Sequence, residues 1–239
     1  MIKFAHIAPT KHILHAGALS EVHMALRHLV IEDDEYVLKF RILADEGAYI
    51  YLDNSQFELG VSCSVDELLE AGRLIGASCL ILPDGDVSET SINEIKKSGY
   101  EVMVIPAGSN FIFDFENALA NPNIDRVGLS YSKASEYMGR PRHSATSRFD
   151  FLNMLEEPLP NKKIHMLGAV SAGEISLMKP YEYAIESWDS SIAVWGGLCN
   201  EDIKNMSTKN PINVDFSSDI AWNLLTESNI HYIKTLQNI

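Results

Sequence analysis

The sequence is poor in cysteine. It holds only Cys63, Cys79 and Cys199, and no two of them have C-x-x-C spacing. An odd, scattered set of thiols argues against a disulfide framework, and the missing spacing argues against a zinc ribbon or a dithiol redox site. The eight histidines show no carboxylate-assisted ligand pattern either. We therefore expect neither a bound metal nor a cofactor.

Long apolar runs are also missing. No stretch of 18 or more consecutive apolar residues exists, so the sequence offers no membrane-spanning helix and predicts no membrane partner. The first residues, 1–6, lack the long apolar segment and the small-residue cleavage site of a secretory signal. A cytoplasmic location is the expectation.

Positive charge is scarce, with 19 Lys and Arg against 33 Asp and Glu, a formal net charge of −14. A negative field of this size weakens non-specific binding to polyanions, including nucleic acid. The densest basic stretch is short and comprises Lys133, Arg140, Arg142 and Arg148, with His143 among them. On charge alone, a solvated loop is the better interpretation of this stretch.

Short apolar segments alternate with helix-like segments along the whole chain, and no Pro/Gly linker divides it. The expected strands are 4–8, 49–52, 79–82, 102–105, 126–130, 163–168 and 184–189. The expected helices are 12–30, 64–75, 91–97, 113–119, 149–155, 173–178 and 221–237. An eighth strand falls at 37–43 or at 193–195, and the pattern does not decide between them.

Nearly apolar strands that alternate with helices predict a parallel sheet covered by helices. The length of 239 residues suits one (β/α)8 barrel of the TIM type, an α/β fold, and we expect a single domain over 1–239. A doubly wound open sheet is the competing fold. No G-x-G-x-x-G motif follows the first expected strand, which disfavours a dinucleotide-binding form of that fold.

Acidic residues stand at the ends of three expected strands: Asp53, Asp84 and Asp189. The glycines Gly108 and Gly128 stand at two others. In this class of fold the loops after the strands carry the chemistry, so the three carboxylates are expected to meet at one acidic site. Such a site suits proton transfer or the stabilisation of positive charge, including glycosyl chemistry. Each aspartate taken alone is more often a helix cap.

Six segments resemble those of the tRNA-guanine transglycosylases, and most closely their small phage and bacterial relatives that insert 7-deazaguanines into DNA. The segments are 52–58 (LDNSQFE), 82–84 (LPD), 104–108 (VIPAG), 127–130 (VGLS), 164–168 (IHMLG) and 187–191 (SWDSS). They follow the family's order and cover roughly residues 49–197. The resemblance implies exchange of guanine in DNA for a free 7-deazaguanine base. It also implies a host-cytoplasm location if the chain is phage-encoded, and a homodimer is a further possibility.

The resemblance also implies residue roles. Asp189 would attack the sugar C1′ and form a covalent glycosyl-enzyme, and Asp53 would deprotonate the incoming base. The base would be bound by Asp84, Phe57, Gly108, Gly128, Leu129 and Leu167. The basic stretch of Lys133, Arg140, Arg142 and Arg148 would then contact nucleic-acid phosphates.

The sequence departs from that family in two respects. Ala107 stands where the family has a base-contacting Gln, and the three-cysteine, one-histidine zinc site of the tRNA enzymes is absent. The missing zinc site favours DNA, or at least a substrate other than tRNA. The remaining alternatives are the same chemistry on tRNA, a nucleoside or deazaguanine glycosidase, and a non-catalytic binding subunit. A metabolic barrel enzyme for a small phosphorylated sugar is a further alternative. It would need a late phosphate loop, of which 195–197 (WGG) is only a faint version.

Overall fold

The protein is an α/β protein whose eight parallel strands form a closed (β/α)8 barrel of the TIM type, with strand order β1 to β8. This confirms the fold class that the sequence predicts. The computed structural model describes residues 2–156, 158–206 and 213–238. The strands are β1 Lys3–His6, β2 Val22–Leu26, β3 Tyr49–Asp53, β4 Cys79–Ile81, β5 Glu101–Val104, β6 Arg126–Ser130, β7 Ile164–Leu167 and β8 Ile185–Ser190.

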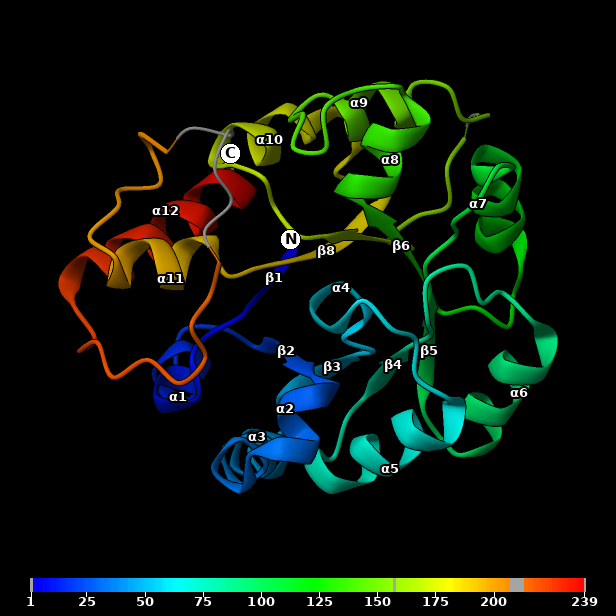
Figure 1. Ribbon diagram of the computed structural model, residues 1–239. Coiled ribbons are helices and arrows are strands. Elements are labelled where there is room, and N and C mark those ends of the chain that lie inside the picture. Colours follow the sequence, from blue (N-terminus) through cyan, green and yellow to red (C-terminus); the bar gives the residue numbers. More distant parts are fainter. Residues whose placement is uncertain (1, 157, 207–212, 239) are drawn as a thin grey trace. The chain divides into compact units, whose positions relative to one another are not determined.

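Helices follow the strands along the chain (Figure 1). The α-helices are α1 Ile13–Gly17, α2 Arg27–Glu32, α3 Asp34–Asp45, α4 Gln56–Leu59, α5 Val65–Ile75, α6 Glu89–Lys97, α7 Phe111–Ala120, α8 Tyr131–Tyr137, α9 Ser147–Leu152, α10 Ala172–Leu177, α11 Ile192–Leu198 and α12 Leu224–Asn238. Two 3-10 helices complete the set: η1 Thr10–His12 and η2 Lys179–Tyr181.

The eighth strand lies where the sequence predicts a helix. Strand β2 occupies 22–26, inside the expected helix 12–30, which the structure divides into η1, α1, β2 and α2. Both candidate positions for this strand are wrong, because 37–43 lies in α3 and 193–195 lies in α11. All five side chains of β2 are buried. A strand buried on both faces shows no alternation, so its apolar run is easily taken for a helix.

By its internal contacts the chain divides into two compact units, 1–20 with 129–239, and 21–128. In the unit 21–128, β2 to β5 and the start of β6 pair as parallel neighbours. Leu80 of β4 faces α5, since a Cβ on Gly72 would lie 2.9 Å from its Cδ2. Helix α5 begins with a capping box, in which the side chains of Ser64 and Glu67 accept hydrogen bonds from each other's backbone N–H groups.

The opposite face of these strands carries a polar cluster near their N-terminal ends. Arg126 forms an ion pair with Glu101, which also accepts a hydrogen bond from the Tyr49 hydroxyl. The guanidinium lies 5.0 Å from the centroid of the Tyr49 ring and 5.5 Å from that of Tyr51. The N-terminal end of a barrel strand is the stability face rather than the catalytic face, so this cluster is structural.

The cluster predicts a pH dependence of stability. Burial alone would raise the pKa of the Glu101 carboxyl, but hydrogen bonds from Tyr49 and Arg126, with the charge of Arg126, lower that pKa overall. A carboxyl whose pKa is lowered by folding stabilises the protein above its unfolded pKa of about 4.3, and that stability is lost as pH falls through the folded pKa. As the pH is lowered from about 5 to 3, the Tm of the Glu101→Gln variant should fall less than the Tm of wild type. Equal falls in Tm would show that Glu101 does not contribute to the pH dependence of stability.

In the unit formed by 1–20 and 129–239, β8 lies between β1 and β7, with Ala5 level with Asp189. Helices α11 and α12 contact each other closely, and α8 packs beside α9 (Figure 1). Gly197 of α11 makes the α11–α12 contact possible, because a Cβ there would lie 2.4 Å from the Thr226 Cα. Both glycines of the pair 196–197 are buried, and the Cβ position of Gly196 faces the segment 201–206. The pair therefore has a packing role and does not form a phosphate loop.

Candidate active site

Asp189 lies one residue before the C-terminal end of β8. Its neighbour Trp188 is fully buried and lies under the guanidinium of Arg148 from α9, 5.0 Å from the ring centroid. Trp188 therefore faces the helices. Because side chains alternate along a strand, Asp189 and Ser187 face the other way, toward the inner side of the sheet.

His165 joins these two residues of β8 from the neighbouring strand β7. Its Nε2 lies 3.0 Å from Asp189 Oδ1, and its Nδ1 lies 2.7 Å from Ser187 Oγ. The backbone N–H of Gly168 also donates to Asp189 Oδ1, at 3.0 Å. A neutral imidazole protonated at Nε2 fits this network, since it donates to the carboxylate and accepts from the Ser187 hydroxyl.

The burial of the three groups decides which one can meet a substrate. The His165 side chain and Ser187 are fully buried, whereas 8% of the Asp189 side chain is exposed. Ser187 therefore cannot act as a nucleophile of the Ser-His-Asp kind, although its spacing to His165 would suit one. Within the described chain, Asp189 Oδ1 holds both hydrogen bonds of the carboxylate and Oδ2 accepts none. Asp189 is thus an anchored carboxylate with one oxygen left for chemistry.

Gly168 follows β7 and has the left-handed φ of 63°. A Cβ at this position would lie 3.0 to 3.1 Å from the ring of Tyr131, the first residue of α8. Glycine therefore meets two demands here, the backbone angle and the close approach of an aromatic ring. Its N–H is thereby fixed on the Asp189 carboxylate.

Replacement of Gly168 by Ala should lower both stability and activity. The left-handed angle costs roughly 1–2 kcal/mol for a residue with a Cβ, and the contact with Tyr131 displaces the N–H from Asp189. Gly139→Ala is the matched control, because Gly139 has a φ of 63° with nothing within 4 Å of an added Cβ. Thermal melts should show destabilisation of both variants, larger in Gly168→Ala because of the Tyr131 contact, and turnover should be lost in Gly168→Ala alone. Equal activities would contradict this role.

The basic stretch follows β6, but two of its four cations are already engaged. Arg148 is fully buried in an ion pair with Glu174, and Arg140 pairs with Asp150 of α9. The expected phosphate contact of Arg148 is therefore incompatible with its burial. Lys133 lies in α8 and has no ion-pair partner in the part of the chain that the structure describes.

His143 links the basic stretch to the Gly168 loop. Its ring centroid lies 5.4 Å from that of Tyr131, the residue that packs against Gly168. The pKa of His143 is lowered, first by burial and then by the positive charge of Arg142. Lys133 is half-exposed and Arg142 is exposed. Both therefore belong to the segment that packs beside the loop after β7, whose Gly168 N–H binds Asp189.

Asp53 and Asp84 belong to the other unit, at the ends of the neighbouring strands β3 and β4. Asp53 Oδ2 accepts from the N–H of Ser55, which has a left-handed φ of 61°. The N–H of Asp84 donates to the side chain of Gln56, and Asn54 donates to the Leu82 carbonyl. Side-chain hydrogen bonds thus fix this loop in a conformation that favours glycine.

The remaining predicted site residues lie on both units. Phe57 of α4 is 61% exposed, and Gly108 is an exposed glycine with a φ of 110°. Gly128 and Leu129 are buried in β6, and Leu167 ends β7 with its carbonyl bound by Arg148. Their expected role in binding a base is untested by the geometry of either unit.

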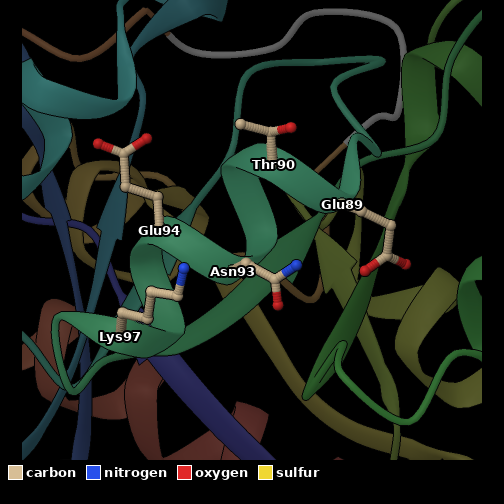
Figure 2. Close-up of a pocket in the computed structure, with 5 residues that line it drawn as sticks. All are labelled: Glu89, Thr90, Asn93, Glu94 and Lys97. Atoms are coloured by element: carbon tan, nitrogen blue, oxygen red, sulfur yellow. The ribbon is translucent and has the colours of Figure 1, made fainter.

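A surface hollow is lined by Glu89, Thr90, Asn93, Glu94 and Lys97, all from α6 (Figure 2). It lies along an outer helix and holds none of the strand-end residues described above. It is therefore not the candidate active site.

Among the described residues, no group of three or more His, Cys, Asp or Glu could hold a metal ion. No helix among them is long and apolar enough to cross a membrane.

The fold and the strand-end carboxylates define the general class of a (β/α)8 barrel with an acidic candidate site. No family model matches the chain, and no curated protein matches it. Among solved structures it is similar to 3-keto-L-gulonate-6-phosphate decarboxylase from Vibrio cholerae (9% identity, TM-score 0.56, 100% of this chain and 97% of that chain). It is also similar to phosphoribosylanthranilate isomerase from Pyrococcus furiosus (14%, 0.50, 98% and 98%) and to the native KDPGal structure (9%, 0.53, 100% and 96%).

These comparisons overturn the resemblance to the guanine transglycosylases. The structural neighbours are an isomerase, a decarboxylase and the KDPGal protein, and none is a pentosyltransferase. The expected pentosyltransferase activity, DNA modification and 7-deazaguanine chemistry are therefore wrong. The physical reason is that an apolar strand with a polar or glycine residue at its C-terminal end is a feature of the barrel fold, so six short segments of that kind do not separate one barrel family from another. The neighbours instead agree with the metabolic barrel alternative.

Proposed function

We propose that the chain is a metabolic enzyme that acts on a small phosphorylated sugar derivative, with Asp189 as the group that transfers a proton. The observation that carries the proposal is the Asp189 carboxylate at the C-terminal end of β8. One of its oxygens is anchored by His165 and Gly168, and the other is unengaged by the described residues. Catalytic residues of (β/α)8 enzymes come from the C-terminal ends of the strands. A cytoplasmic location belongs to the same proposal.

An anchored carboxylate suits proton transfer at a carbon next to a carbonyl group. Isomerisation, aldol cleavage and decarboxylation of keto sugars can all pass through an enolate, so one base at one position can take part in any of them. The names of two structural neighbours contain a sugar phosphate, 3-keto-L-gulonate 6-phosphate and phosphoribosylanthranilate. Because these likenesses establish the fold alone, the reaction type rests on Asp189.

Cationic side chains near the loop after β7 support an anionic substrate. Lys133 and Arg142 lie in the segment that packs against Gly168 through Tyr131 and His143. The backbone N–H groups of the loop after β7 are already used, since 168 and 169 donate to Asp189 and 170 donates to Glu174. A phosphate group would therefore be bound by cationic side chains rather than by those N–H groups.

The test is a panel of phosphorylated aldoses, ketoses and keto acids, each paired with the same compound without phosphate. Conversion is followed by chromatography and mass spectrometry with the purified chain. We expect conversion of at least one phosphorylated compound and none, or far slower conversion, of its unphosphorylated partner. A Lys133→Ala variant should raise KM for the phosphorylated compound. Equal rates with and without phosphate would contradict the substrate class.

A further inference from the structure

We infer that the buried Arg148–Glu174 pair is a positioning device for Asp189, acting through the loop after β7. Neither side chain contacts Asp189, so both are positioning residues rather than catalytic ones. The inference rests on the proposed function insofar as it makes Asp189 the reacting group. The physical coupling of the pair to the Asp189 carboxylate is measurable without any substrate.

Arg148 uses its whole guanidinium group inside the protein. Its Nη1 donates to the carbonyls of Leu129 and Leu167, at 3.1 and 2.8 Å. Its Nη2 donates to the carbonyl of Gly168 at 2.7 Å. These carbonyls belong to the end of β6 and the end of β7, so one side chain joins two neighbouring strand ends and the first residue of the loop. Only arginine, whose planar guanidinium group carries five N–H donors, can make these hydrogen bonds with a single side chain.

Glu174 of α10 completes the pair. Its Oε1 accepts from Arg148 Nε at 2.8 Å, and its Oε2 lies 2.7 Å from Nη2. The same Oε2 accepts the N–H of Val170 at 2.9 Å. Both side chains are fully buried, so each charge depends on the other for compensation. The pair therefore fixes the loop at both ends, at the Gly168 carbonyl and at the Val170 N–H.

The loop between those two ends binds Asp189. The Gly168 N–H donates to the Asp189 carboxylate, and the Ala169 N–H donates to the Asp189 backbone carbonyl, both at 3.0 Å. The Ser190 hydroxyl donates back to the Ala169 carbonyl at 3.3 Å. The Gly168 residue thus has its carbonyl bound by Arg148 and its N–H bound by Asp189. Movement of the pair would move the donor that orients the carboxylate.

Burial of two charges costs desolvation free energy, so an ion pair is not the most stabilising way to fill this volume. An apolar pair of similar volume is often as stable as a buried ion pair, or more stable. Such a pair would leave the strand-end carbonyls and the Val170 N–H without partners, and the loop free to shift. The charged pair therefore serves the geometry of the loop more than the stability of the fold.

The experiment compares wild type with the double variant Arg148→Met/Glu174→Met and with Arg148→Lys. The double variant removes both charges together and leaves neither uncompensated. Asp150→Asn is the control, because Asp150 pairs with Arg140 in a half-exposed ion pair at the same helix α9. Backbone amide hydrogen exchange at 168 and 169 is measured by NMR without substrate. Turnover and KM are then measured with any compound that the panel identifies.

In the double variant we expect amide exchange at 168 and 169 to accelerate by at least about tenfold while the amides of β3 keep their protection. We expect kcat to fall by up to ~100-fold through misplacement of Asp189, with KM changing by less than about threefold. Arg148→Lys should fall between wild type and the double variant, and Asp150→Asn should match wild type. If the double variant does not fold, Arg148→Lys decides by the same two measurements.

Unchanged exchange at 168 and 169, or unchanged kcat in a folded variant with accelerated exchange, would overturn the positioning role. A uniform loss of protection across the chain, with kcat and KM altered together, would also overturn it in favour of a purely structural pair. If the panel gives no turnover for wild type, the proposed function fails, while the exchange measurement still decides whether the pair positions the loop.

Discussion

Replacement of Asp189 by Asn should lower turnover by about three orders of magnitude and leave the fold intact. General acid–base catalysis by one side chain contributes roughly 10²–10⁴ in rate, and Asn cannot take up a proton. The variant keeps the local geometry, since an amide oxygen can still accept from His165 Nε2 and from the Gly168 N–H. The measurements are steady-state kinetics and a thermal melt of the same preparations.

Asp53→Asn is the informative comparison for this variant. Asp53 ends β3 in the other unit, and its Oδ2 accepts from the Ser55 N–H. Loss of turnover in Asp189→Asn with a native melt supports the account. If Asp189→Asn keeps most of its turnover and Asp53→Asn loses it, the catalytic role belongs to Asp53.

Replacement of Gly197 by Ala is expected to have the largest effect on stability. The added Cβ would lie 2.4 Å from the Cα and 2.6 Å from the backbone nitrogen of Thr226. Backbone atoms cannot rotate away, so α11 and α12 would have to separate. Overpacking of a core usually costs about 1–3 kcal/mol, and we expect about 3 kcal/mol or more here, a Tm loss of roughly 6–12 °C for a chain of this size.

Gly196→Ala provides the matched control in the same helix. Its Cβ would meet the Met206 sulfur at 3.3 Å, the far end of a flexible side chain that can move. Differential scanning calorimetry of the two variants should show a large loss for Gly197→Ala and a small one for Gly196→Ala. Equal losses would mean that helix propensity, rather than the α11–α12 contact, decides the outcome.

Strand and helix alternation was enough to predict the barrel, because most strands apart from β2 contain a short apolar run that a helical segment follows. The bounds of β3 and β6 were predicted to within one residue. Strand β2 was missed for a physical reason. Its five residues are buried on both faces, so they form a nearly continuous apolar run without the alternation that marks a half-buried strand. Burial by tertiary packing decided its conformation, and a single sequence does not carry that information.

The sequence pattern pointed to Asp189 but gave no role to the residue that holds it. His165 lies in the expected strand 163–168, three residues before its end, and the histidines were considered only as metal ligands. Alternation along neighbouring strands could have placed His165 on the same face as Ser187 and Asp189. The role of Glu174 had no comparable signal, since only the fold brings α10 against Arg148.

The basic stretch shows that ion pairs formed in the fold are also hard to predict from the sequence. Charge alone favoured a solvated loop for these four cations, and only the family resemblance implied phosphate contacts. In the structure Arg148 pairs with Glu174 and Arg140 pairs with Asp150. Ion pairing of this kind depends on residues that are distant or helically spaced, so a local charge count overestimates the free positive charge. Lys133 is half-exposed and Arg142 is exposed in the segment that packs beside Gly168.

The most direct test of Asp189 as the proton-transfer group is solvent deuterium incorporation. A substrate from the panel is turned over in D₂O, and the product is examined by proton NMR at the carbon next to the carbonyl. If Asp189 transfers the proton, wild type should place one deuterium at that carbon, and Asp189→Asn should incorporate it slower by about three orders of magnitude. Product formed by wild type without deuterium at that carbon, or incorporation by Asp189→Asn at the wild-type rate, would contradict it.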